Sequence, residues 1–385
     1  MRFVLLVALL AIAAATVSCG GGSEAGYGNL IFIARKNGDY TIRLPVRGTQ
    51  HPKELADALP WDSAPVWSPD GSMVAFYSDR VFNLTDADDD VDVYVMRADG
   101  SGLTQLTDGE EPDAFPVWSP DGSRIAFYSE RDGNGEIYTM DVAGGNVERL
   151  TESEGVDIPY GWTQNGDRIL FGSNREGKFD LFAMDADGGN VDQLTDSDGD
   201  DLSAVWSAGG DTIAYQEVSG INTEMFVMNA DGSDRRNVSV RPLDDTGPVW
   251  APDGVRLAFV SKRDGNQEIY VLDTFYSELT RITAVGRDDN SPAWAPDGTR
   301  IAFISNRDFD QELYVANADG TGEKRLTDGP GWEAHPAWSP DGSRIAFASF
   351  REGRRDIYVL NPDGTNLVRL TNDEANEQTA AVNAR

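Results

Sequence analysis

The chain has 385 residues, with 65 Asp and Glu against 32 Lys and Arg, and a formal net charge of −33. This charge argues against binding nucleic acid or docking electrostatically on anionic lipid, while 40% hydrophobic and 10% aromatic residues suffice for a large core. One Cys excludes an internal disulfide scaffold, and two His argue against a zinc site built from Cys and His.

Residues 1–18 have the pattern of a secretory signal peptide. Arg2 precedes an apolar run from Phe3 to Val17, which is shorter than the roughly 20 residues that a transmembrane helix needs. Cys19 follows where such a signal is cleaved, and residues 16–19 (Thr-Val-Ser-Cys) resemble a bacterial lipobox. We expect a lipid on Cys19 and a flexible tether over residues 19–28. The alternative is an ordinary signal peptide with an incidental cysteine.

A repeat fills the rest of the chain. Its tryptophans recur at one interval of 51 residues and then five of 44, and each is followed nine residues later by Phe or Tyr. The longer interval is explained by extra residues between Phe76 and Tyr94. The tryptophans that mark the start of each unit are Trp67, Trp118, Trp162, Trp206, Trp250, Trp294 and Trp338.

Each unit reads as four short strands. In the last unit, Trp338 lies in the first strand, and residues 339–342 (Ser-Pro-Asp-Gly) suit a tight turn. β-rich runs follow at 344–348 and 356–360, then a Pro-Asp-Gly turn and a fourth strand at 367–370. Units of roughly 40–45 residues with four strands are typical of β-propeller blades.

The two ends of the chain complement each other. Residues 30–56 match the second to fourth strands of a unit, and residues 379–383 match a first strand. We therefore predict an all-β fold: a single eight-bladed β-propeller over residues 29–385, closed by the N- and C-terminal strands, which removes exposed sheet edges. Seven blades with a loose N-terminal ribbon is the alternative.

The repeat also resembles a known family. Trp-Ser-Pro-Asp-Gly, then Ile-Ala-Phe, Ile-Tyr, Asp-Gly and Leu-Thr, seen best at 118–151 and 338–371, is similar to the TolB-type, WD40-like PD40 repeat. The resemblance implies a propeller and an envelope role. It leaves no residues for the N-terminal domain of TolB or for the hydrolase domain of prolyl-oligopeptidase relatives.

Two charged columns accompany the repeat. A carboxylate stands five residues before every Trp position, in the order Asp62, Asp113, Asp157, Asp201, Asp245, Asp289, Glu333 and Glu377. A base follows the Phe position by four residues, except at Ser219. The resemblance places the acids near the mouth of the central channel, where we predict a binding ring together with Trp332 and His335. The alternative is a salt-bridge network that fixes blade geometry.

Metal binding is considered at two places. The unit of Trp206 lacks the base, so Asp200, Asp201, Glu217 and Glu224 are the candidates for a Ca²⁺ site. The acidic loop at 86–92 has Val91 where a calcium loop needs Gly, and we interpret it as a solvated loop. No cofactor is otherwise expected.

The sequence shows no catalytic constellation, because it has no Gly-x-Ser-x-Gly motif and its two His are far apart. We predict a non-catalytic, lipid-anchored monomer of the bacterial cell envelope, in the periplasm or at the outer membrane. It would bind an envelope protein or peptide, would not bind nucleic acid, and would meet the membrane only through its anchor. A metal-dependent hydrolase or lyase acting on carbohydrate or peptide and a cation or small-ligand sensor are the alternatives.

Overall fold

The computed structural model describes residues 30–36, 39–44, 53–54, 63–78, 91–97, 101–220, 222–238, 244–329, 331–339, 341–351, 356–369 and 376–382. These residues form β-strands joined by turns and loops, and they include no helix of the length and apolarity that crossing a membrane requires. Cys19, Asp62 and residues 86–90, together with the predicted signal peptide and tether, lie outside the described residues.

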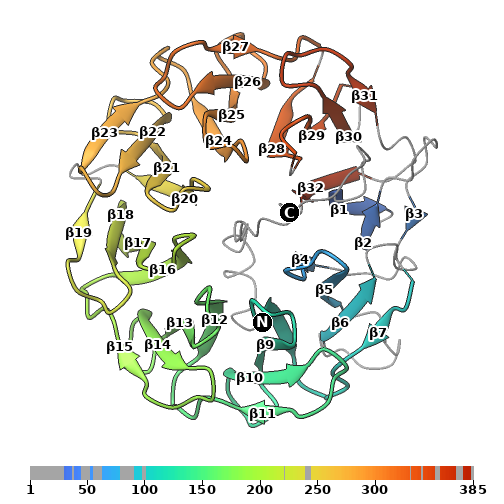
Figure 1. Cartoon of the computed structure of the whole chain (residues 1–385), viewed down its shortest axis with the longest axis vertical. Helices are drawn as coiled ribbons and strands as arrows, with labels where there is room; N and C mark the ends of the chain where they lie inside the picture. The colour runs from blue at the N-terminus through green and yellow to red at the C-terminus, as the bar shows by residue number, and fades with distance from the viewer. Residues whose placement is uncertain are drawn as a thin grey trace.

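Between residues 63 and 369 the chain forms seven four-stranded antiparallel sheets, each from four consecutive strands, as predicted for propeller blades. The first strands lie nearest the centre of the molecule (Figure 1) and are β4 (Ser63–Trp67), β8 (Asp113–Trp118), β12 (Asp157–Trp162), β16 (Asp200–Trp206), β20 (Asp245–Trp250), β24 (Asp289–Trp294) and β28 (Glu333–Trp338). The second strands are β5 (Met73–Ser78), β9 (Arg124–Ser129), β13 (Arg168–Ser173), β17 (Thr212–Ser219), β21 (Arg256–Ser261), β25 (Arg300–Ser305) and β29 (Ile345–Ser349).

The third strands are β6 (Asp92–Arg97), β10 (Glu136–Asp141), β14 (Asp180–Asp185), β18 (Asn222–Asn229), β22 (Glu268–Asp273), β26 (Glu312–Asn317) and β30 (Asp356–Leu360). The outermost strands are β7 (Thr104–Gln105), β11 (Glu148–Arg149), β15 (Asp192–Gln193), β19 (Arg236–Asn237), β23 (Glu278–Arg281), β27 (Lys324–Arg325) and β31 (Val368–Arg369). Each sheet is named below by its first strand.

Strands from the two ends of the chain share a further sheet. Its order is β3-β2-β1-β32, with β1 (Leu30–Lys36), β2 (Asp39–Leu44), β3 (Lys53–Glu54) and β32 (Asn376–Val382). β32 runs antiparallel to β1, with Ile31 opposite Ala381. In Figure 1 this sheet lies between the β28 sheet and the β4 sheet.

The Trp and Phe columns form the core between neighbouring sheets. Trp118, Ile125 and Phe127 of the β8 sheet pack in one buried cluster with Ala75 and Val95 of the β4 sheet. The indole of Trp118 donates to Val66 O at 3.1 Å, and Trp162, Trp250, Trp294 and Trp338 make the corresponding bond to the preceding sheet. A buried Trp removes about 200 Å² from water, worth at most about 5 kcal/mol. These aromatics are therefore core residues.

The turn after Trp118 is fixed by its aspartate. In the β8 sheet, Asp121 Oδ1 accepts from Ser123 N at 3.0 Å and from Ser119 Oγ at 2.6 Å. Gly122 has φ 69°, in the left-handed region where glycine carries no steric penalty. The Ser-Pro-Asp-Gly sequence therefore sets the hairpin and, with it, the register of the sheet.

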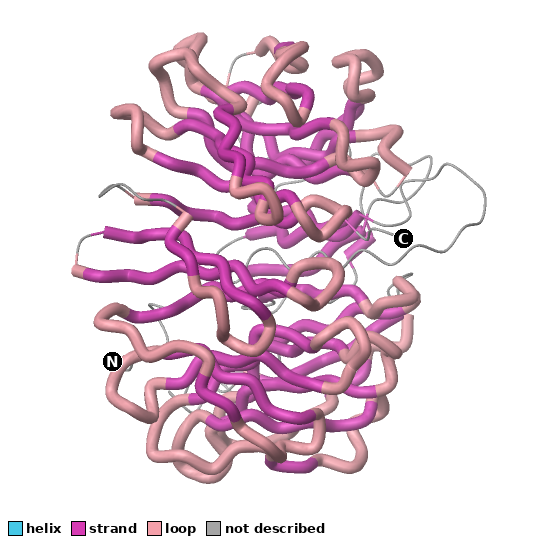
Figure 2. The backbone as a smooth tube through the Cα atoms, turned by 60° about the vertical axis from the view of Figure 1, so that its left-hand side comes forward, coloured by secondary structure: helices cyan, strands magenta, loops and turns pink. Residues whose placement is uncertain are grey.

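Consecutive antiparallel strands give the molecule two distinct faces (Figure 2). The loops that lead into each first strand and those between second and third strands lie on one face, which we call the entry face. The turns between first and second strands and between third and fourth strands lie on the opposite face, which we call the turn face. The predicted binding residues that the structure describes belong to the entry face.

Candidate functional site

Each acid of the column, as far as its side chain is described, is buried. Asp113, Asp157, Asp201, Asp245, Asp289 and Glu333 begin their first strands, or lie one residue inside, with at most 1% of their surface exposed. The expectation of an accessible carboxylate ring is therefore wrong for these six residues. Glu377 belongs to β32 and Asp62 lies outside the described residues, so the prediction for these two stays a prediction.

Five of the six acids pair with the arginine of the second column. In the β12 sheet, Arg175 Nη2 lies 2.9 Å from Asp157 Oδ2, and Arg175 Nε donates to Ser173 Oγ at 2.9 Å. The same guanidinium lies 5.4 Å from the ring centre of Phe171 and 4.7 Å from that of Phe182. The equivalent pairs are Arg131–Asp113, Arg263–Asp245, Arg307–Asp289 and Arg351–Glu333.

This arrangement is the salt-bridge network that stood as the alternative to a binding ring. The arginine neutralises a carboxylate that burial alone would make costly, and its flat face covers the two core aromatics. Burial raises the pKa of Asp157 even though Ser173 and Arg175 act to lower it. Burial likewise raises the pKa of Glu333 to about 7. These pairs therefore fix the entry end of five of the sheets.

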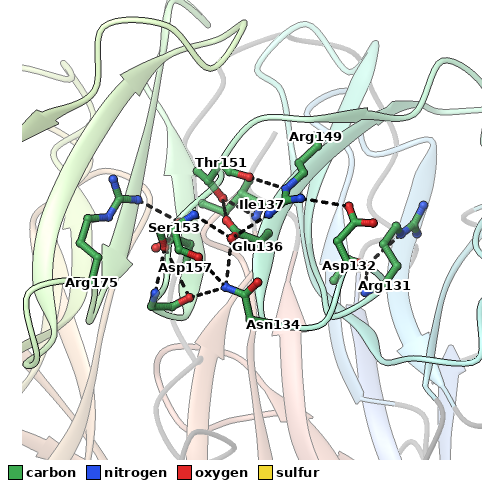
Figure 3. Close-up of polar contacts among 12 residues, drawn as sticks. Arg131, Asp132, Asn134, Glu136, Ile137, Arg149, Thr151, Ser153, Asp157 and Arg175 are labelled. Atoms are coloured by element: carbon green, nitrogen blue, oxygen red, sulfur yellow. Dashed lines mark hydrogen bonds and ion pairs between the residues drawn. The ribbon is translucent and has the colours of Figure 1, made fainter.

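A second acid column, which the sequence reading missed, begins the third strands. Glu136 accepts from Thr151 Oγ1 at 2.5 Å, from Ser153 N at 2.9 Å and from Arg149 Nη2 at 3.0 Å (Figure 3). Burial acts to raise the pKa of Glu136, but these hydrogen bonds outweigh it and the pKa is lowered. Ser153 Oγ in turn donates to Asp157 at 3.3 Å.

Through Ser153, this second column connects the β8 sheet to the β12 sheet. Its other members with buried side chains are Asp92, Asp180, Glu268 and Glu312. Their 44-residue spacing, visible at 136, 180, 268 and 312, was the signal that would have revealed them.

The β16 sheet departs from this pattern, as the missing base at Ser219 indicated. Some of its carboxylates nevertheless have partners. Arg235, on the loop between β18 and β19, pairs with Glu217, and its guanidinium lies 4.4 Å from the ring centre of Phe226. An arginine from another part of the sheet thus takes the stacking position. Asn237 donates to Glu224.

The four candidate metal ligands do not form a metal site. Asp200 Oδ1 accepts from Phe179 N at 2.9 Å, whereas Asp201, Glu217 and Glu224 are cross-strand neighbours. Nowhere in the described part of the chain do three or more His, Cys, Asp or Glu side chains stand so that they could hold a metal ion. The prediction of a Ca²⁺ site at these residues is therefore wrong.

Trp332 and His335 lie at the entry end of the β28 sheet. The ring of Trp332 stacks on Phe350, with 5.7 Å between centroids and 10° between planes. His335 is half-buried, with φ 51°, at a β-bulge in β28 between Ala334 and Ala337. The structure places both residues on the entry face but assigns neither a ligand.

One aromatic on this face was not predicted. Phe309, in the loop between β25 and β26, is 84% exposed and has φ 79°. The equivalent residues of three other sheets are Gly133, Gly177 and Gly265, with φ between 98° and 102°. Arg287 covers one face of the ring at 5.1 Å. A Phe in this left-handed conformation strains the backbone, which glycine would not.

Comparison with known proteins identifies the repeat. The family model of the TolB β-propeller domain (PD40) matches residues 81–201, 115–239, 172–310 and 289–385. A curated relative, an uncharacterized peptidase YuxL of Bacillus subtilis, is 36% identical over 74 residues, which is 18% of this chain and 10% of that protein.

Solved structures share the fold. Dipeptidyl peptidase 4 of Porphyromonas gingivalis matches with a TM-score of 0.63 at 13% identity, over 94% of this chain and 60% of that one. An oligogalacturonate lyase of Vibrio parahaemolyticus matches with a TM-score of 0.55 at 16% identity, over 86% of this chain and 96% of that one. At such low identity the likeness concerns the fold alone.

Proposed function

Because the chain belongs to the TolB β-propeller family, we propose that it is a non-catalytic scaffold of the bacterial cell envelope that binds a protein or peptide on its entry face. The observation that carries this proposal is Phe309, an exposed aromatic at a position where equivalent loops have glycine. Rigid exposed aromatics are frequent anchors of protein interfaces. A binding role accounts for a residue that the fold alone would not select.

The surroundings of Phe309 extend this surface. Glu333 N donates to Gln311 O at 2.8 Å, so the loop that carries Phe309 is joined to the segment that carries Trp332. Phe350 N donates to Trp332 O at 3.0 Å. The proposed surface therefore runs from the β24 sheet to the β28 sheet, and Trp332 belongs to it.

Two finer features complete the proposal. The propeller has eight blades and is closed by the sheet that combines β1 with β32; the antiparallel pairing of Ile31 with Ala381 supports this. The chain is held in the envelope by a lipid on Cys19, as the resemblance of residues 16–19 to a lipobox suggests.

Site-specific photo-crosslinking tests the surface. A photoreactive phenylalanine analogue replaces Phe309 in the protein produced in its native cells, and the control carries the same analogue at Phe275, which is 77% exposed on the turn face. We expect a discrete protein adduct from position 309 that is absent from position 275, and that Trp332→Ala weakens. No adduct at 309, or equal adducts at both positions, would overturn the proposal.

A further inference from the structure

The turn between β22 and β23 presents two aromatic rings to solvent on the turn face. Phe275 is 77% exposed and Tyr276 is 74% exposed, and their rings meet edge to face with 4.9 Å between centroids. The positions 44 residues before and after this pair hold Asp-Gly, at 231–232 and 319–320. The repeat therefore does not require aromatic residues here, and exposed apolar groups that a fold does not require indicate an interaction surface.

Hydrogen bonds hold this turn in one conformation. Asp273 Oδ1 accepts from Phe275 N at 3.0 Å and from Tyr276 N at 2.8 Å. Arg236 of the neighbouring β16 sheet donates to Thr274 O at 3.0 Å. Because the backbone that carries the rings is already fixed, little conformational entropy is lost when the rings are buried by something outside the protein.

Aliphatic side chains extend the aromatic pair. Val255, in the turn between β20 and β21, is 37% exposed, and its carbonyl accepts from Thr274 N at 3.1 Å and from Thr274 Oγ1 at 2.7 Å. Leu279 of β23 is 38% exposed. The apolar groups thus occupy the tips of two adjoining turns. A projecting tip, unlike a groove, suits insertion into a soft surface.

The predicted anchor leaves from the same face. β1 begins at Leu30, opposite Val382, and ends at Lys36 in a hairpin with Asp39. Its sheet has the strand order of the other sheets, so β1 takes the place of a second strand and begins on the turn face. Cys19 lies eleven residues before Leu30, which is at most about 38 Å of extended chain. A lipid on Cys19 therefore holds the turn face close to the membrane.

We propose that Phe275 and Tyr276 insert into the surface of a zwitterionic lipid bilayer, so that the turn face lies on the membrane and the entry face points away from it. Aromatic rings, and Tyr with its polar hydroxyl above all, favour the boundary between lipid headgroups and hydrocarbon. The net charge of −33 gives no attraction to anionic lipid, so the contact is apolar.

This inference rests on the lipid anchor and the closed propeller of the proposed function, and it deepens that function. It adds a second membrane contact to an anchor that the sequence predicts to be the sole one. With the turn face on the bilayer, Phe309 on the entry face stays accessible to a partner.

The single cysteine of the chain allows the anchor to be supplied chemically. The chain from Cys19 onward is coupled through this thiol to a maleimide lipid in phosphatidylcholine vesicles, so the test does not depend on lipidation in cells. A photoreactive phenylalanine analogue replaces either Phe275 or Phe309, which are similarly exposed on opposite faces. We expect at least five times more lipid adduct from position 275 than from position 309.

Matched variants separate insertion of the rings from mere proximity to lipid. The analogue is placed at Val255, and the yield of lipid adduct is compared in two backgrounds. We expect Phe275→Ser/Tyr276→Ser to lower this yield at least fivefold and Phe309→Ser to change it less than twofold. All three substituted residues are exposed, so the fold should stay intact, which circular dichroism verifies.

Four results would overturn the proposal: no lipid adduct from position 275, equal lipid adducts from positions 275 and 309, equal effects of the two Ser variants, or a dimer-sized protein adduct from position 275 in place of lipid, which would indicate a second copy of the chain. None of these results bears on the protein adduct expected from position 309 in cells. Failure of the membrane contact can therefore be told apart from failure of the proposed function.

Discussion

The variant Arg175→Met measures how much a buried ion pair contributes to the free energy of unfolding. In Arg175→Met the aliphatic stem is retained, but Asp157, fully buried, loses its cationic partner. A buried carboxylate without its partner typically costs about 3 to 5 kcal/mol. The unfolding free energy should therefore fall by several kcal/mol at neutral pH.

The cost has a ceiling that depends on pH. Asp157 can become protonated instead of remaining charged, and this costs about 1.4 kcal/mol for each pH unit above the ordinary Asp pKa of about 3.9. The ceiling is about 4 kcal/mol at pH 7 and about 1.5 kcal/mol at pH 5. Because burial already raises the pKa of Asp157, the real cost lies below this ceiling.

Urea unfolding at pH 5, 6 and 7 gives the required comparison. We expect the destabilisation by Arg175→Met to shrink steadily as the pH falls, leaving at pH 5 mainly the loss of contact with Phe171 and Phe182. The variant Arg175→Met/Asp157→Asn should recover much of the lost stability at pH 7. A destabilisation that is independent of pH, or no recovery in the double variant, would refute the ion-pair account.

Three further predictions concern stability. Burial raises the pKa of Asp201 to about 6. Ionising this carboxyl in the folded state therefore costs free energy above that pH, and the cost is absent below about pH 4. Asp201→Asn should accordingly increase the unfolding free energy by about 1 kcal/mol or more at pH 8 and by less as the pH falls. For the same reason Glu333, with its pKa raised to about 7, should make the wild type more stable at pH 5 than at pH 8, and the opposite trend in urea titrations would contradict both assignments. Trp294→Phe removes the indole bond to Val249 O and should cost about 1 to 2 kcal/mol; a loss below 0.3 kcal/mol, on the order of experimental error, would show that this bond does not join the sheets.

The sheets were predictable because the repeat is regular. The Trp and Phe columns recur every 44 residues from Trp118 onward, and five of the seven Trp units carry a Pro-Asp-Gly turn. Each feature acts within one sheet or between neighbours. Strand identity and order between residues 63 and 369 therefore followed from spacing alone. The acid column and its arginines were also visible, but whether they lie in solvent or pair in the interior depends on packing.

The β16 sheet shows where spacing fails. Ser219 marked the missing base correctly, but the replacement, Arg235, lies sixteen residues further along the chain and reaches the same aromatic pair from a different loop. Only the three-dimensional register brings Arg235 beside Glu217. The exposure of Phe309 was equally hidden, because a lone Phe in an irregular loop has no periodic signature.

Disulfide trapping at the ends of the chain tests the closed propeller most directly. Leu30 lies opposite Val382 and Ile31 opposite Ala381, and adjacent antiparallel pairs alternate between wide and narrow spacing, so one of these two pairs suits a disulfide. With Cys19 replaced by Ser, the account predicts rapid oxidation of Leu30→Cys/Val382→Cys or of Ile31→Cys/Ala381→Cys within one molecule, but not of the mismatched Leu30→Cys/Thr379→Cys. Failure of both matched pairs to form an intramolecular disulfide would contradict closure.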